Sequence, residues 1–141
     1  MAFHDMGPAD GRPVILIHGL FSNAQVNWIK FGHAAKLAAK GRRVIMPDLR
    51  AHGESARSYD TADYTADILA DDNLGLVEQL GFGPGEYDLG CYSLGGRTTA
   101  RISAVGNAGT LANVFGAAAI SDVPGGALVS WRRVRSIVTS G

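Results

Sequence analysis

The sequence lacks an excess of charge of either sign. Its 141 residues carry 13 Lys plus Arg and 13 Asp plus Glu. Without net charge, the chain has no overall field that would attract it to nucleic acid or to an anionic membrane surface. We therefore expect a small-molecule partner, and neither a nucleic acid nor a membrane.

Cysteines and long apolar runs are also scarce. Cys91 is the only cysteine, so no disulfide can form within the chain. Purely apolar stretches such as VILI at 14–17 and AAAI at 117–120 are far shorter than the roughly 20 residues of a membrane-spanning helix. The start, MAFHDMGPADGRP, lacks the basic region and apolar core of a secretory signal. These features predict a cytoplasmic protein.

Short apolar runs bounded by proline, glycine and charged residues are present, and they predict strands buried on both faces. They cover residues 14–17 and 44–46, and a third run ends at Leu89 and Cys91. The run at 114–120 is a weaker strand candidate, because its alanines and its glycine disfavour strands. The length corresponds to one domain, which we expect to span residues 1–141.

Helical patterns lie between these runs. Apolar residues recur at helical spacing from Trp28 to Ala38, before Gly41, and again from Tyr64 to Leu80, before Gly81. Strands that alternate with helices predict an α/β fold with a mostly parallel sheet and flanking helices. In such a fold, functional residues gather at the carboxyl ends of the strands.

A polar or glycine-rich motif follows each of the three clearer strand candidates. The motifs are HGLF at 18–21, DLRAHGES at 48–55 and CYSLGG at 91–96. A nucleophilic serine must be exposed, activated by a base and placed beside hydrogen-bond donors for the oxyanion. Gly95 and Gly96 suit a sharp strand-to-helix turn that would expose Ser93. The alternative is that Ser93 is an ordinary serine in a glycine-rich turn.

Taken together and in this order, the three motifs resemble those of the α/β-hydrolase superfamily, over residues 3–101. The usual Gly-x-Ser-x-Gly pattern has Cys91 in the place of its first glycine. The resemblance implies that Ser93 is the nucleophile and that the backbone N–H groups of Leu20 and Leu94 are the oxyanion donors. It also implies hydrolysis of small carboxylic esters or related acyl substrates, with no cofactor and no metal.

The triad of this superfamily runs in the order serine, acid, histidine. After Ser93 the sequence contains one acidic residue, Asp122, and no histidine, because His52 is the last one. Asp122 follows the run at 114–120, where some relatives carry the triad acid, although a helix or turn cap is an alternative role. Relatives continue with further strands and helices, so we expect a truncated α/β-hydrolase fold.

The remaining histidines in these motifs have structural and catalytic alternatives. The resemblance assigns His18 to shaping the oxyanion loop and the polar side chains of residues 48–55, His52 among them, to bracing their turn. Direct catalysis by either histidine is the alternative. Cys91 is expected to pack under the turn, with a thiol nucleophile as the alternative.

Two other functions compete with that of a serine hydrolase. One is a catalytically impaired fragment or a non-catalytic interaction module that self-associates through an exposed sheet edge; the missing histidine favours it. The other is nucleotide binding, suggested by the spacing of Gly90 and Gly95. A phosphate-binding loop then requires lysine and serine or threonine, whereas Gly96 and Arg97 stand in those places. Nucleotide binding is therefore disfavoured.

Overall fold

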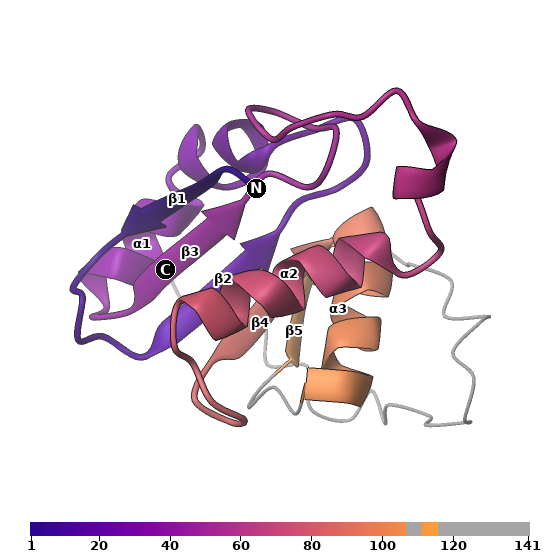
Figure 1. Cartoon of the computed structure of the whole chain (residues 1–141). Coiled ribbons are helices and arrows are strands. Elements are labelled where there is room, and N and C mark those ends of the chain that lie inside the picture. The colour runs from indigo at the N-terminus through magenta and orange to yellow at the C-terminus, as the bar shows by residue number, and fades with distance from the viewer. Residues whose placement is uncertain (107–110, 116–141) are drawn as a thin grey trace.

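A single mixed sheet forms the centre of the computed structural model, which describes residues 1–106 and 111–115 (Figure 1). Its five strands lie in the order β1-β3-β2-β4-β5. β1 pairs antiparallel with β3, and the other three neighbouring pairs are parallel. The strands are β1 (Phe3–Met6), β2 (Pro13–Ile17), β3 (Arg43–Pro47), β4 (Asp88–Tyr92) and β5 (Leu111–Phe115). The predicted, mostly parallel sheet is confirmed.

Helices cover both faces of this sheet. In Figure 1, α2 and α3 lie in front of the strands, and α1 lies behind β1 and β3. None of the helices in the described part of the chain is long and apolar enough to cross a membrane. The helical elements are η1 (Gln25–Ile29, a π-helical turn), α1 (His33–Ala39), η2 (Thr61–Asp63, a 3-10 turn), α2 (Ile68–Gln79) and α3 (Leu94–Gly106).

The central strand β2 divides the buried core into two parts. Ile15 and Ile17 belong to the cluster that includes residues of α2 and α3, whereas Val14 and Leu16 belong to the cluster around Trp28. This alternation follows from the period of two in a β-strand. Because both faces of β2 are buried, its sequence is a continuous apolar run, as expected for a parallel sheet with helices on both sides.

The first predicted helix is interrupted. Gly32 adopts a left-handed conformation with φ of 76°, and it separates the π-helical turn from α1. The second helix also begins later than the apolar pattern indicates, at Ile68 rather than near Tyr64. A 3-10 turn precedes it, and the Asp60 side chain accepts a hydrogen bond from the Ala62 N–H at 2.9 Å. Apolar spacing alone does not reveal such breaks.

Both edges of the described sheet differ from the sequence-based expectation. β1 was not predicted, because its four residues alternate between more and less exposed positions and form no apolar run. The strand predicted at 114–120 begins earlier, at Leu111, and includes Phe115. Residues 116–120 and Asp122 lie outside the described residues.

A buried carboxylate joins the amino end of β4 to neighbouring segments. Asp88 is 8 % exposed and accepts hydrogen bonds from the guanidinium groups of Arg12 and Arg42. Arg12 also donates to the Gly85 carbonyl at 2.9 Å. Burial opposes ionisation of Asp88, but the two arginines outweigh it and hold the pKa of Asp88 below its ordinary value of 3.8.

We expect Asp88→Asn to lower the free energy of unfolding at pH 7 by about 1–3 kcal/mol, because it removes the charge from a buried hydrogen-bond acceptor. Since folding lowers the pKa of Asp88, its contribution is complete above its ordinary pKa of 3.8 and is lost as the pH falls through the folded value. Urea denaturation at pH 7 and at successively lower pH measures the free energy of unfolding of both proteins. The difference between Asp88→Asn and wild type is expected to narrow below about pH 4.

Asp5→Asn serves as the matched control, because Asp5 pairs with Arg43 at 36 % side-chain exposure. An exposed pair contributes about 0–1 kcal/mol, so the free energy of unfolding of this variant is expected to stay closer to that of wild type. Equal losses of stability in both variants, or a loss in Asp88→Asn that does not change with pH, would contradict the account.

Candidate active site

Ser93 occupies the sharp turn between β4 and α3. Its φ is 50°, in the left-handed region that non-glycine residues rarely adopt. The Gly96 N–H donates to the Ser93 carbonyl at 2.8 Å and closes the turn. Ser93 is exposed, although Cys91 directly before the turn is buried. This is the strand-to-helix geometry that presents a nucleophile to solvent; the catalytic role of Ser93 remains a prediction.

Glycines allow this turn to pack directly against the loop that follows β2. A Cβ atom on Gly95 would lie 2.3 Å from the carbonyl oxygen of Ile17. A Cβ atom on Gly19 would lie 3.4 Å from the Cβ atom of Ser93 and 2.7 Å from the Tyr92 ring. The HGLF and CYSLGG motifs therefore meet in space, as their positions after parallel strands predict.

Leu20, one of the two expected oxyanion donors, lies in the loop after β2. Within residues 1–106 and 111–115, the backbone N–H groups of Leu20 and Leu94 donate to no acceptor. Leu20 is 52 % exposed and Phe21, with φ of 55°, is 93 % exposed. An oxyanion hole requires N–H groups that are free to donate beside the reacting serine, so the oxyanion roles of Leu20 and Leu94 stay predictions.

His18 links the loops after β2 and β3. Its Nε2 atom accepts a hydrogen bond from the Leu49 N–H at 2.9 Å, so the proton lies on Nδ1, which donates to the Gly19 carbonyl at 2.7 Å. His18 is fully buried, and burial lowers its pKa below the ordinary value of 6.5. With both nitrogens engaged, His18 shapes the loop and has no atom left to accept the proton of Ser93.

His52 lies next to His18, and the centres of the two rings are 5.3 Å apart. Its Nδ1 atom is 2.9 Å from the Arg50 carbonyl, to which it donates in the tautomer protonated there. In the part of the chain that the structure describes, the Ser93 hydroxyl forms no hydrogen bond with a histidine or carboxylate. The described residues thus contain a candidate nucleophile without a positioned base.

Asp48 is a second buried link between the loops. Its carboxylate accepts hydrogen bonds from the N–H groups of Ala24, at 2.8 Å, and Glu54, at 2.9 Å. The Ser55 hydroxyl donates to the Asp48 carbonyl at 2.5 Å. Bracing of the turn at 48–55 by polar side chains is therefore confirmed. The bond to Ala24 in the preceding loop was not foreseen, because sequence spacing does not show which distant backbone groups meet.

The other candidate side chains separate into buried and exposed ones. Cys91 is 2 % exposed, and burial raises the pKa of its thiol to about 11, which disfavours a thiol nucleophile at neutral pH. Trp28 is 3 % exposed and packs in the core. Phe21, at 93 % exposure, and Tyr92, at 39 %, are exposed within the two motifs that meet at Ser93.

Metal-binding clusters are not found among the described residues, where no suitable group of His, Cys, Asp and Glu side chains comes together.

Comparison of sequences relates the chain to one fold family and to several enzymes. Residues 12–108 match the model of the alpha/beta hydrolase fold. The dihydrolipoyllysine-residue acetyltransferase component of the acetoin cleaving system of Pseudomonas putida is 35 % identical over 73 % of this chain and 26 % of its own length. A haloalkane dehalogenase of Mycobacterium marinum is 40 % identical over 46 % of this chain and 21 % of its own length. The chain thus spans about a quarter of the length of these curated relatives.

Solved structures agree in fold. A thioesterase domain from the curacin biosynthetic pathway has a TM-score of 0.70 at 24 % identity, over 79 % of this chain and 40 % of that one. A thermophilic esterase from Thermogutta terrifontis has a TM-score of 0.66 at 32 % identity, over 79 % of this chain and 39 % of that one. The described architecture therefore corresponds to part of these larger folds.

We expect Gly95→Ala to destabilise the protein by about 1–3 kcal/mol, because the new methyl group would overlap a backbone carbonyl that cannot move aside. Gly75→Ala is the matched control: Gly75 lies inside α2 and its Cβ position has no neighbour within 4 Å. There the same change stabilises by about 1 kcal/mol through helix propensity. Urea denaturation measures both changes, and a Gly95→Ala protein as stable as wild type would contradict the close packing.

Proposed function

Because this chain belongs to the alpha/beta hydrolase family, we propose that it is a serine hydrolase acting on small carboxylic esters or related acyl substrates. The left-handed conformation of Ser93, in a turn packed against the loop after β2, is the observation that carries the proposal. Non-glycine residues are held in this conformation mainly where surrounding structure enforces it, often at functional sites.

The proposed reaction begins with attack of the Ser93 hydroxyl oxygen on the acyl carbon. As the new C–O bond forms, the carbonyl oxygen becomes an oxyanion, which accepts hydrogen bonds from the N–H groups of Leu20 and Leu94. Collapse of this intermediate breaks the bond to the alcohol, which leaves with the proton that Ser93 has lost. Attack by water then releases the acid and returns a proton to the Ser93 oxygen. Asp122 is proposed as the triad acid; it lies outside the described residues.

Exposed apolar side chains support an acyl substrate. Leu20, Phe21 and Tyr92 adjoin the two motifs that meet at Ser93, and each is at least 39 % exposed. Apolar surface beside a few polar groups is typical of small-molecule sites. The names of similar proteins include an esterase and a thioesterase. The absence of nucleic-acid and membrane partners belongs to this proposal and is supported by the balanced charge. A cytoplasmic site of action is also proposed, and the single cysteine supports it.

A second candidate is a catalytically impaired hydrolase fold that acts as an interaction module. It is favoured by the absence, among the described residues, of a histidine or carboxylate hydrogen-bonded to Ser93, together with the lack of histidines after His52 in the given sequence. Self-association through an edge strand of the described sheet, β1 or β5, is the interaction that we propose for this alternative.

A fluorophosphonate probe distinguishes the two functions, because it reacts with an activated serine. If Ser93 is activated, the native protein is labelled and Ser93→Ala is not, and hydrolysis of a short-chain nitrophenyl ester falls to the buffer rate in the variant. The loss of a triad member typically costs several orders of magnitude in rate.

A complete hydrolase of the family serves as the positive control for the probe. If wild type and Ser93→Ala are equally unlabelled while the control reacts, the serine-hydrolase proposal is wrong. A concentration-dependent dimer in sedimentation analysis would then support the interaction module.

A further inference from the structure

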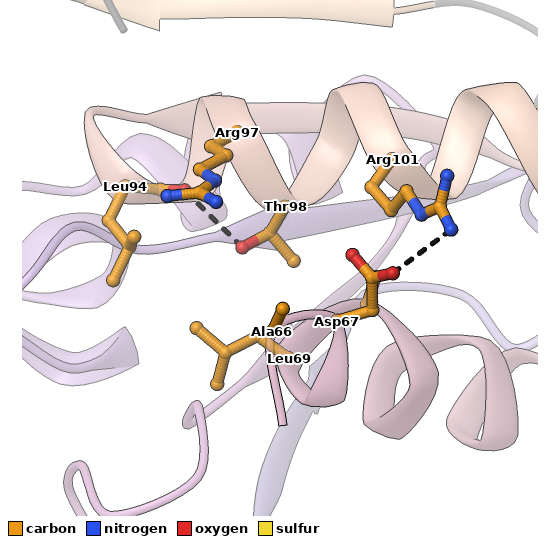
Figure 2. A pocket seen from close by; sticks show the side chains of 8 residues that line it. Ala66, Asp67, Leu69, Leu94, Arg97, Thr98 and Arg101 are labelled. Carbon is orange, nitrogen blue, oxygen red and sulfur yellow. Dashed lines mark hydrogen bonds and ion pairs between the residues drawn. The ribbon is translucent and has the colours of Figure 1, made fainter. Parts of the chain in front are cut away.

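A hollow of about 240 Å³ lies between the start of α2 and the first turns of α3 (Figure 2). This volume is about eight times the ~30 Å³ that a water molecule occupies in the liquid. It is therefore large enough for a short organic molecule. The residues that line it are Ala66, Asp67, Leu69, Ala70, Leu94, Arg97, Thr98 and Arg101.

The charges around the hollow do not balance. Arg101 pairs with Asp67 at 3.0 Å, and the Thr98 hydroxyl donates to the Leu94 carbonyl at 3.3 Å. Arg97 is exposed and forms no ion pair with any residue that the structure describes. One positive charge at the edge of the hollow is thus uncompensated among the described residues.

The remainder of the lining is apolar. Leu94 comes from α3, and Figure 2 shows it on the opposite side of the hollow from Leu69 and Ala66, which lie at the start of α2. A guanidinium group binds a carboxylate through two parallel hydrogen bonds, and adjacent leucine and alanine side chains bury a short hydrocarbon chain.

We propose that this hollow binds a small monocarboxylate with a short apolar chain. The carboxylate pairs with Arg97, and the chain lies against Leu69 and Leu94. This binding requires no hydrolysis, so it holds or fails independently of the activity of Ser93.

Hexanoate titrated into the ¹⁵N-labelled protein tests the proposal by NMR. The amide signals of Leu69, Ala70 and Thr98 are expected to shift with a common Kd. Arg97→Gln is expected to raise that Kd about two- to five-fold, the effect of losing an ion pair at a partly open site. Asp67→Asn is expected to lower it, because it removes a carboxylate that competes for the arginines.

Arg57→Gln is the matched control, because Arg57 is an exposed arginine that does not line the hollow. It removes the same charge and is expected to leave the Kd unchanged. If Arg57→Gln and Arg97→Gln changed the Kd equally, the binding would depend on the overall charge of the protein and not on Arg97, and the proposal would be overturned.

Two further probes test the ligand class. Hexanol that binds as tightly as hexanoate would show that the carboxylate is not recognised. Inorganic phosphate that binds as tightly would show that the apolar chain is not recognised. Either result, or an absence of shifts at the hollow, overturns the proposal.

Discussion

The approach of α3 to the end of β2 is the constraint on which the candidate site depends. Gly95 lies so close to the Ile17 carbonyl that no side chain fits between them. The chain can reach that position directly after β4 only through a sharp turn, and Ser93 takes the left-handed conformation that the turn demands. One backbone contact therefore exposes the serine and brings it next to the HGLF loop.

Two buried polar side chains hold the surrounding loops to one another. His18 joins Gly19 to Leu49, and Asp48 joins Ala24 to Glu54. All four partners are backbone groups, so these bonds fix the path of the loop backbones. They place no requirement on the side chains of the partner residues. Exposed residues such as Leu20 and Phe21 are thus positioned by the loops without taking part in their stabilisation.

The predictability of the chain differs between its centre and its edges. The runs that became β2, β3 and β4 were recognisable because both faces of these strands are buried and nearly every residue is apolar. The edge strand β1 escaped prediction because one of its sides faces solvent. The break at Gly32 was missed because a glycine within an apolar helical pattern gives no indication of its φ.

For the candidate site, the sequence predicted the turn at Ser93 and its meeting with the HGLF loop. Motif positions suffice there, since parallel strands end at the same edge of the sheet. The roles of Leu20, Leu94 and Asp122 rest on the family resemblance and remain predictions. The sequence could not show that both His18 nitrogens are occupied, because those bonds involve backbone groups from two separate loops.

Comparison of Ser93→Gly with Ser93→Ala tests most directly whether packing holds residue 93 in the left-handed conformation. Glycine adopts this conformation without a steric penalty, whereas alanine does not. The account predicts that Ser93→Gly is more stable than Ser93→Ala by about 1 kcal/mol in urea denaturation. Equal stability of the two variants, or a less stable Ser93→Gly, would contradict the claim.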